Sequence, residues 1–254
     1  MIQIGIYGAS GKMGQMIASC LKESKLAKLS VVYDKKVESL TGCSAKVAKN
    51  LDELFNSCDV VIDFTINDGT KALLNFAKNH QKPLCIGTTG LDDEAKKLLN
   101  ECAKTAPILY ATNMSLGAAI ANKLVAIAAK ALRDFDIEIV EMHHKHKKDA
   151  PSGTALTLAT TAANARGLNL KDVINTGRDG LVGERKKDEI AVLAKRGGDI
   201  VGEHDVGFYG EGEYLQVLHT ATSRATFANG AIKAALWLVG KKPGLYSIDD
   251  CLGI

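Results

Sequence analysis

The chain has 254 residues, of which 46% are hydrophobic and 24% charged, and its formal net charge at pH 7 is +3. This length and composition are ordinary for a globular protein of one large or two modest domains, which excludes disordered and fibrous classes. The small net charge argues against a dedicated nucleic-acid-binding protein, whose positive field would be much stronger.

A strand, a glycine-rich turn and a helix are predicted at the start of the chain. Residues 2–7 are a short apolar run, and residues 8–14 read Gly-Ala-Ser-Gly-Lys-Met-Gly before an amphipathic stretch. A second strand, 29–33, ends at Asp34, 20 positions after Gly14 (34 minus 14). This pattern is typical of a dinucleotide-binding fold, in which the helix N-terminus holds the pyrophosphate and the acidic residue binds ribose. A tight turn that binds no ligand is the alternative.

The three glycines of this turn have different expected roles. Gly8 allows the sharp turn, Gly11 lets backbone amides approach a pyrophosphate, and Gly14 lets the helix pack closely on the sheet. Their spacing, Gly-x-x-Gly-x-x-Gly, differs by one residue from the commonest fingerprint.

Strands and helices continue to alternate along the first half of the chain. Strands are predicted at 60–64, 84–86 and 108–110, with helices at 67–79 and 92–104. Repeated units of this kind predict an α/β fold with a Rossmann-like, doubly wound parallel sheet, whose ligands lie at the carboxyl ends of the strands. Small polar loops suited to ribose or a nicotinamide amide follow three strands, at 63–65, 87–90 and 111–114. The same Gly and Thr residues are also ordinary turn formers.

A helix at 115–132 and a strand at 137–142 lead to the most unusual segment of the chain. Residues 143–148 contain three of the six histidines and three lysines, and Pro151-Ser152 resembles a helix cap. A solvated basic loop, a metal site and a nucleic-acid patch are three alternatives. The lysines would repel a divalent cation, and the segment lacks the interleaved aromatic residues of a nucleic-acid surface.

We interpret this segment as a site for a small dicarboxylate, with no metal. Such a ligand requires fixed positive charge, backbone amides at a helix N-terminus and a proton source in one place. Lys147 supplies charge and supports proton delivery, a histidine donates a proton near neutral pH, and Gly153-Thr154 presents amides.

Other features bear on the compartment and on partners. The six cysteines form no Cys-x-x-Cys pair, no apolar run reaches the roughly 18 residues that span a bilayer, and no signal-peptide pattern is present. We therefore expect reduced, buried thiols in a cytoplasmic protein that binds neither membranes nor nucleic acids.

Segment 138–155, Glu-Ile-Val-Glu-Met-His-His-Lys-His-Lys-Lys-Asp-Ala-Pro-Ser-Gly-Thr-Ala, resembles the signature of the dihydrodipicolinate reductase family. The resemblance extends over nearly the whole chain, including 8–14, 87–90, Asn113, 202–204 and 223–231. It implies that NADH or NADPH reduces the dihydrodipicolinate formed from 4-hydroxy-tetrahydrodipicolinate. The product would be tetrahydrodipicolinate, an intermediate of lysine and diaminopimelate biosynthesis.

The resemblance also implies roles for individual residues. His143 matches the proton donor and Lys147 the accompanying lysine donor, whereas His144, Gly153 and Thr154 match substrate-binding positions. The positions that match cofactor contacts are Gly8, Ala9, Ser10, Gly11, Lys12, Met13, Asp34, Gly87, Thr88, Thr89, Ala111, Thr112, Asn113 and Met114.

Three cofactor positions bear on which nicotinamide is used. Lys35 is added to the site because its charge can offset a 2'-phosphate beside Asp34. Lys12 stands where the family commonly has arginine, and Met114 where it commonly has phenylalanine. Lysine keeps the charge but loses the bidentate geometry of arginine, so the phosphate preference is left open.

The family architecture implies a dinucleotide-binding domain of residues 1–114 and 224–254 and an α+β substrate-binding and oligomerisation domain of residues 115–223. The second domain would contain a mixed, open sheet with strands at 190–193, 201–206 and 214–219. Helix 227–239 would then return to the first domain. Exposed edges of an open sheet invite pairing between subunits, and the resemblance implies a homotetramer.

Two other classes of protein would share the nucleotide-binding half. Another two-domain amino-acid dehydrogenase, of the aspartate or homoserine type, would lack the His-His-x-His-Lys run. A cofactor-sensing regulatory protein would keep the glycine loop without the chemistry. Substrate-dependent loss of nicotinamide absorbance distinguishes a reductase from both.

Overall fold

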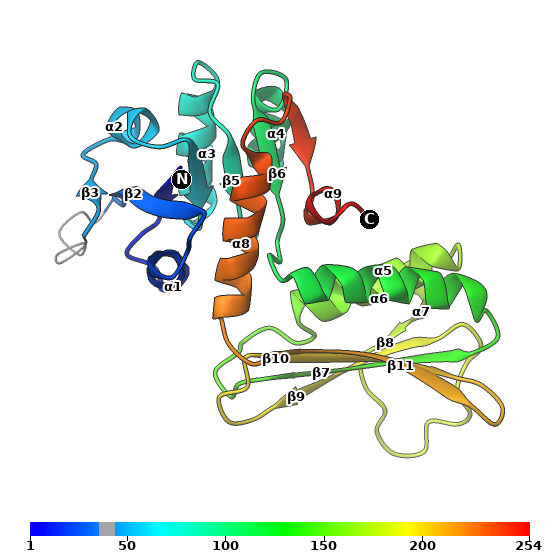
Figure 1. Cartoon of the computed structure of the whole chain (residues 1–254). Coiled ribbons are helices and arrows are strands. Elements are labelled where there is room, and N and C mark those ends of the chain that lie inside the picture. The colour runs from blue at the N-terminus through cyan, green and yellow to red at the C-terminus, as the bar shows by residue number, and fades with distance from the viewer. Residues whose placement is uncertain (36–43) are drawn as a thin grey trace. The chain divides into compact units, whose positions relative to one another are not determined.

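The computed structural model describes residues 1–35 and 44–254, which divide into two compact units (Figure 1). Unit 1 comprises residues 1–116 and 224–254, and unit 2 comprises residues 117–223. Each unit is built around its own sheet. Four of the cysteine thiols are buried and Cys20 is half-buried, while Cys43 lies outside the described residues.

The sheet of unit 1 has seven strands in the order β12-β6-β5-β4-β1-β2-β3, and each neighbouring pair is parallel. Its strands are β1 (Ile2–Tyr7), β2 (Ala27–Tyr33), β3 (Lys46–Val47), β4 (Val60–Asp63), β5 (Leu84–Ile86), β6 (Pro107–Tyr110) and β12 (Gly244–Tyr246). The chain order reverses at β1, which lies between β2 and β4. A reversal of this kind is the switch point of a doubly wound sheet, so the predicted Rossmann-like fold is confirmed.

Helices cover both faces of this sheet (Figure 1). They are α1 (Lys12–Lys22), α2 (Leu51–Asn56), α3 (Asn67–Ala77), α4 (Asp93–Cys102), α8 (Ala225–Leu238) and the short C-terminal α9 (Ile248–Leu252). Apolar residues of α2, α3 and α4 share one core cluster with Val61 of β4. Helices α1 and α8 pack against each other, and α8 also packs on β4, β5 and β6. Val60, Val61 and Ile62 of β4 are fully buried, as expected for a central parallel strand that is covered on both faces.

The approach of α8 to the end of β6 depends on a single glycine. A Cβ built on Gly230 would lie 1.7 Å from the carbonyl oxygen of Met114, which is backbone and cannot rotate away. We expect Gly230→Ala to lower the free energy of unfolding by about 1–3 kcal/mol through overpacking. Thermal unfolding would measure this loss. The matched control is Gly153→Ala, because a Cβ at that helical glycine meets nothing within 4 Å. Equal stability of the two variants would contradict the prediction.

Unit 2 contains a five-stranded mixed sheet in the order β11-β10-β7-β9-β8. Its strands are β7 (Asp136–His143), β8 (Ile174–Asn175), β9 (Ile190–Arg196), β10 (Gly202–Tyr209) and β11 (Tyr214–Ala221). Strand β10 is antiparallel to β7 and β11, whereas β9 is parallel to β7 and β8. The predicted mixed sheet is therefore confirmed. Its strands extend several residues beyond the apolar runs that indicated them, because cross-strand pairing continues through polar residues such as Lys195 and Arg196.

The helices of unit 2 are α5 (Leu116–Ala131), α6 (Gly153–Ala165) and the short α7 (Leu170–Val173). Residues of α5 and α6 share a core with Ile137 and Ile139 of β7. Side chains alternate along a strand, so Glu141 and His143 lie on the same, helix-covered face as these isoleucines. The last residues of β7 therefore bring two polar side chains to the start of α6.

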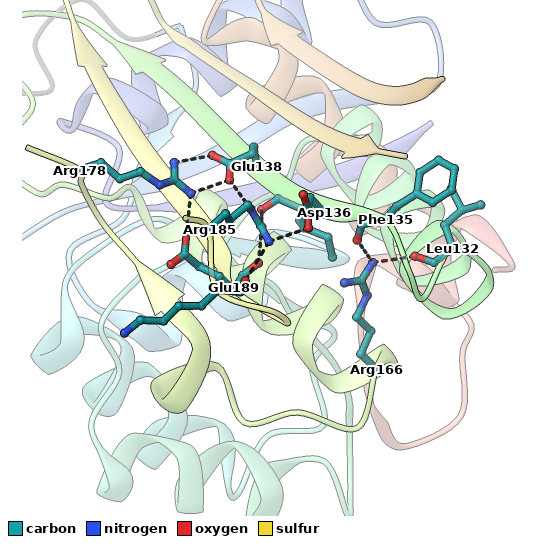
Figure 2. Close-up of polar contacts among 10 residues, drawn as sticks. Leu132, Phe135, Asp136, Glu138, Arg166, Arg178, Arg185 and Glu189 are labelled. Atoms are coloured by element: carbon teal, nitrogen blue, oxygen red, sulfur yellow. Dashed lines mark hydrogen bonds and ion pairs between the residues drawn. The ribbon is translucent and has the colours of Figure 1, made fainter. Parts of the chain in front are cut away.

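Arginines hold the connection between β8 and β9 against β7 (Figure 2). Both terminal nitrogens of Arg178 donate to Glu138, at 3.0 and 2.8 Å, and Arg178 also pairs with Glu189. Arg185 donates to Glu138, to Asp136 and to the Ile137 carbonyl. Planar guanidinium groups that bond several carboxylates hold these side chains in place better than isolated surface ion pairs do. The central strand is thus anchored on the residues that precede Glu141 and His143.

Candidate active site

The glycine turn of unit 1 has the tight geometry that its sequence indicates. Gly8 has φ +84°, and a Cβ there would lie 2.8 Å from the carbonyl oxygen of Phe64. A Cβ on Gly14 would lie 2.4 Å from the Gly8 oxygen and 2.6 Å from the Ala9 Cα. Glycine is therefore required at position 14 because α1 packs against the glycine turn itself. The sequence predicted a close contact of Gly14 with the sheet, but its closest contacts are with Gly8 and Ala9 of the turn.

The N-terminus of α1 is open to an anion. The N-cap residue is Gly11, which has no side chain to bond the first-turn amides, and both Gly11 and Lys12 are exposed. Asp34 follows β2 and faces the same turn, where its Oδ2 accepts from Ser10 N at 3.1 Å and Ser10 Oγ at 2.7 Å. The structure thus brings Ser10, Lys12 and Asp34 together at one end of the sheet. Lys35 is exposed beside Asp34.

A buried carboxyl group organises the next two strand ends. Asp63 is fully buried and accepts from Thr65 N at 2.8 Å and Thr65 Oγ1 at 2.7 Å. Thr70 Oγ1 lies 2.5 Å from Asp63 Oδ2 and 2.9 Å from Thr88 Oγ1. Burial raises the pKa of Asp63, and the surrounding hydroxyl donors oppose that rise. The sequence pattern did not assign these positioning roles to Asp63 and Thr70.

The remaining cofactor candidates, apart from Met13 of α1, lie at the ends of β5 and β6. Gly87 is buried under the Phe64 ring, which a Cβ there would meet at 2.4 Å, whereas Thr89 and Thr112 are exposed. Asn113 Oδ1 accepts from Ser115 N at 2.9 Å and so shapes the chain before α5. The remaining three candidates are partly or fully buried, namely Met13, Ala111 and Met114.

The centre of the unit 2 site is a pair formed by His143 and Glu141. Glu141 is fully buried, and its Oε2 lies 2.7 Å from His143 Nδ1. Arg196 donates to both carboxylate oxygens at 2.8 Å, and Ser152 N donates to Oε1 at 2.9 Å. Ser152 is also the N-cap of α6, since its Oγ accepts from Ala155 N. Glu141 therefore joins His143 to the beginning of α6.

Strand register brings further groups to His143. Arg196 is paired with His143 across β7 and β9, and His204 is paired with Glu141 across β7 and β10. The His204 ring meets the His143 ring edge-on at 5.2 Å between centroids, and its Nε2 lies 3.0 Å from Ser152 Oγ. A Cβ on Gly202 would lie 3.0 Å from His143 Nε2, so glycine leaves room around that nitrogen.

The pKa values of this cluster follow from its burial and charges. Burial lowers the pKa of His143, Glu141 opposes this effect, and Lys147 and Arg196 add to it, with a net lowering. Burial would raise the pKa of Glu141, but hydrogen bonds from Arg196, His143 and Ser152 outweigh it and the pKa is lowered. Burial lowers the pKa of His204 to about 4. At neutral pH the ligand-free site therefore contains a carboxylate and two neutral imidazoles.

The other substrate candidates surround this cluster. Lys147 Nζ pairs with Asp149 Oδ1 at 2.9 Å, and the mostly exposed Asp149 makes this pair easy to exchange for another carboxylate. In the part of the chain that the structure describes, His144 Nδ1 is buried without a hydrogen-bond partner. Gly153 is exposed as the first residue of α6, and Thr154 follows it. Their amides lie in the first turn, where the partial positive charge of a helix is concentrated.

Residues 1–35 and 44–254 hold neither a metal-binding cluster nor a membrane-spanning helix. They contain no cluster of three or more His, Cys, Asp or Glu side chains placed to hold a metal ion. They also contain no helix that combines the length and apolar character needed to cross a bilayer.

Family models match both units of the chain. "Dihydrodipicolinate reductase, N-terminus" matches residues 2–114, and "Dihydrodipicolinate reductase, C-terminus" matches residues 117–252. The 4-hydroxy-tetrahydrodipicolinate reductase of Campylobacter curvus (strain 525.92) is 66% identical, with 100% of both chains covered. The enzyme of the same name from Campylobacter hominis is 61% identical, covering 100% of this chain and 98% of its own.

Solved structures give the same result for the fold. A dipicolinate-bound dihydrodipicolinate reductase from Paenisporosarcina sp. TG-14 superimposes with a TM-score of 0.77 at 26% identity, covering 97% of each chain. A probable dehydrogenase from Thermotoga maritima gives a TM-score of 0.67 at 13% identity, with 98% of this chain and 92% of that chain covered. The second likeness concerns the fold alone.

Proposed function

The chain belongs to the dihydrodipicolinate reductase family, and we propose that it reduces the dihydrodipicolinate formed from 4-hydroxy-tetrahydrodipicolinate to tetrahydrodipicolinate. The reaction is a step of lysine and diaminopimelate biosynthesis, and such an enzyme would work in the cytoplasm. One observation carries the proposal: His143 is held by a buried carboxylate at the N-terminus of α6. The residue that we propose as proton donor and the helix end that we propose as anion site therefore lie together in a family member.

Unit 2 would supply the substrate site. His143 acts as the general acid that protonates the carbon beside the hydride acceptor, and Lys147 supports proton delivery. One carboxylate of the substrate replaces Asp149 on Lys147, while the other binds the amides of Gly153 and Thr154 with His144 nearby.

Unit 1 would hold the cofactor, NADH or NADPH, which supplies the hydride when bound. The uncapped N-terminus of α1 and the exposed Lys12 fit a pyrophosphate. Asp34 binds the ribose, and the strand-end residues 87–89 and 111–114 line the nicotinamide side. GenD2 from gentamicin A biosynthesis, solved in complex with NAD, shares the fold with a TM-score of 0.59 at 14% identity.

A direct assay tests the proposal. The purified chain is mixed with NADH or NADPH and enzymatically generated 4-hydroxy-tetrahydrodipicolinate, and the loss of nicotinamide absorbance is followed. We expect turnover only when the substrate is present. Turnover with aspartate semialdehyde or homoserine instead would favour the other dehydrogenase classes, and binding of NADH without any turnover would favour a regulatory protein.

We expect both cofactors to be used with similar efficiency. Asp34 suits the ribose hydroxyls of NADH, whereas Lys35 beside it offsets the 2'-phosphate of NADPH. The two values of kcat/KM should differ by less than about hundredfold, which is about 2.7 kcal/mol. Lys35→Ala should shift the ratio towards NADH. A larger preference in the unaltered protein, or no shift in the variant, would show that this adjacent pair does not select the phosphate.

Binding of dipicolinate should take up a proton. The pKa of His143 is lowered in the ligand-free site, and a dianion beside the ring raises it again. Affinity should therefore increase as the pH falls from about 8 towards the ordinary histidine pKa of about 6.5. Calorimetry in buffers of different ionisation enthalpy measures the uptake. His143→Gln should abolish it, and unchanged uptake in that variant would assign the proton to another group.

We also propose a homotetramer assembled through the open sheet of unit 2. Its edge strand β11 exposes three large apolar side chains, Tyr214, Leu215 and Leu218, at 66%, 47% and 61%. Exposed apolar edges of this kind favour pairing between subunits. Light scattering should give four times the chain mass, and Leu218→Lys should give a smaller species. A monomer in the unaltered protein would overturn this proposal.

A further inference from the structure

We propose that Glu141, clamped by Arg196, is the positioning residue of this site: it fixes the proton of His143 on Nδ1 and leaves Nε2 to exchange a proton with the substrate. The inference rests on the proposed function only for the identity of the substrate. Its structural part concerns one hydrogen bond, between Glu141 Oε2 and His143 Nδ1 at 2.7 Å.

The contact with Glu141 decides which nitrogen of His143 carries the proton. An ionised carboxylate accepts hydrogen bonds and cannot donate one. A neutral imidazole has one donor nitrogen and one acceptor nitrogen, and the partner of one nitrogen decides the role of the other. Because Glu141 faces Nδ1, the proton stays on Nδ1. The opposite nitrogen, Nε2, is then the atom that gains and loses a proton.

Glu141 stays ionised although it is fully buried, because Arg196 pairs with it. A lone buried carboxyl would be protonated, and it would then donate to Nδ1 and reverse the arrangement. Arg196 prevents this with two parallel hydrogen bonds of 2.8 Å, one to each carboxylate oxygen. The Arg196 guanidinium is itself tied to the Asp149 carbonyl at 2.7 Å. The clamp therefore determines the direction in which the hydrogen bond to His143 runs.

Charged and titratable side chains surround the His143 ring. The titratable groups that act on His143 come from every neighbouring segment, namely Glu141 on β7, Arg196 on β9, His204 on β10 and Lys147 after β7. Glu141 alone among them is an anion with a hydrogen bond to the ring. Gly202 keeps the space at Nε2 open, since a Cβ there would lie 3.0 Å from it. Glu141 thus orients the His143 ring, and Gly202 keeps its Nε2 accessible.

Nuclear magnetic resonance of the unaltered protein tests the proton position without any dependence on activity. The histidines are labelled with ¹⁵N, and the His143 signals are identified by their loss in His143→Gln. We expect the neutral ring to carry its proton on Nδ1, with a strongly deshielded Nδ1 proton. A ring protonated on Nε2 would overturn the proposal, whether or not the protein turns over substrate.

Kinetic measurements on Glu141→Gln test whether catalysis depends on this hydrogen bond. We expect kcat to fall about tenfold or more, because the amide no longer fixes one tautomer, while KM for the nicotinamide changes little. The limb of the pH profile that requires protonated His143 should move to lower pH, since the carboxylate no longer stabilises the imidazolium. An unchanged kcat and an unchanged limb would overturn the proposal.

Matched variants separate positioning from stability. Glu138→Gln removes another arginine-paired carboxylate of β7, which belongs to the network of Figure 2. Strand alternation places Glu138 on the opposite face of β7 from Glu141 and His143. This variant should leave kcat and the pH limb unchanged. If Glu141→Gln does not fold because Arg196 is left unpaired, the double variant Glu141→Gln/Arg196→Gln removes both charges. It should fold and keep a low kcat. Recovery of the unaltered kcat in the double variant would assign Glu141 a purely structural role.

Discussion

Replacing His143 with glutamine is expected to lower kcat by about 10² to 10⁴ while leaving KM for the nicotinamide cofactor near its unaltered value. The His143 side chain is only 11% exposed and contacts Glu141, so the replacement must preserve that contact. A glutamine amide can still donate to Glu141, but it cannot deliver a proton to carbon. The chemical step should therefore fail in a protein that remains folded.

The control for this variant is His146→Gln. His146 belongs to the same basic run but is exposed, so its replacement removes a histidine without altering the buried cluster. It should keep near-normal kcat. Circular dichroism and the thermal midpoint establish that both variants are folded. A folded His143→Gln with near-normal kcat would move the general acid to Lys147 or to water.

The parts of this site that sequence predicts are those encoded by neighbouring residues. The basic run, the Ser152 cap and the start of α6 lie within 12 consecutive positions, 143 to 154, and the structure keeps them together. The turn at Gly8 is local in the same sense. Hydrophobic periodicity also indicated the long strands and helices of unit 1. It gave no sign of the two-residue β3 or of β12, which begins at Gly244 and lacks the apolar run that marked the equally short β5.

The parts that sequence does not predict depend on long-range register. Arg196 and His204 reach His143 and Glu141 because β9 and β10 pair with β7 in one particular alignment. A shift of one residue would turn every side chain of a strand to the other face, and no local pattern fixes that alignment. Glu141 is different. It lies two residues before His143 in a predicted strand, so alternation alone would have placed both side chains on one face.

Thr70 and Thr88 illustrate the same limit in unit 1. Thr70 lies in α3, and Thr88 follows β5. The Thr70 hydroxyl contacts both the fully buried Asp63 carboxyl and the Thr88 hydroxyl, so it links the two strand ends. The sequence shows an ordinary Asp-Phe-Thr turn at this point, and only the parallel pairing of β4 with β5 brings Thr88 beside it. The glycine at position 87 is likewise explained by the Phe64 ring, a contact between two different loops.

The last prediction concerns the two carboxylates of the substrate. Pyridine-2,6-dicarboxylate should compete with substrate, and pyridine-2-carboxylate should bind at least about tenfold more weakly. The dianion would reach both Lys147 and the first turn of α6, where unpaired amides and a partial positive charge are concentrated. Losing one charge-assisted contact costs on the order of 1.5 to 3 kcal/mol. Competitive inhibition constants for the two compounds measure the difference.

Two neighbouring lysines allow a matched test of which side chain causes the difference in affinity between the dicarboxylate and the monocarboxylate. Lys147 is half-buried beside His143, whereas Lys148 is exposed, so Lys147→Gln and Lys148→Gln remove equal charge at different places. In Lys147→Gln the ratio of the two inhibition constants should fall to a few-fold, because the second carboxylate has already lost its partner. Lys148→Gln should keep the full ratio, since a charge in bulk water is screened. Equal inhibition by both compounds in the unaltered protein, or an equal loss in both variants, would move the dicarboxylate away from Lys147 and α6.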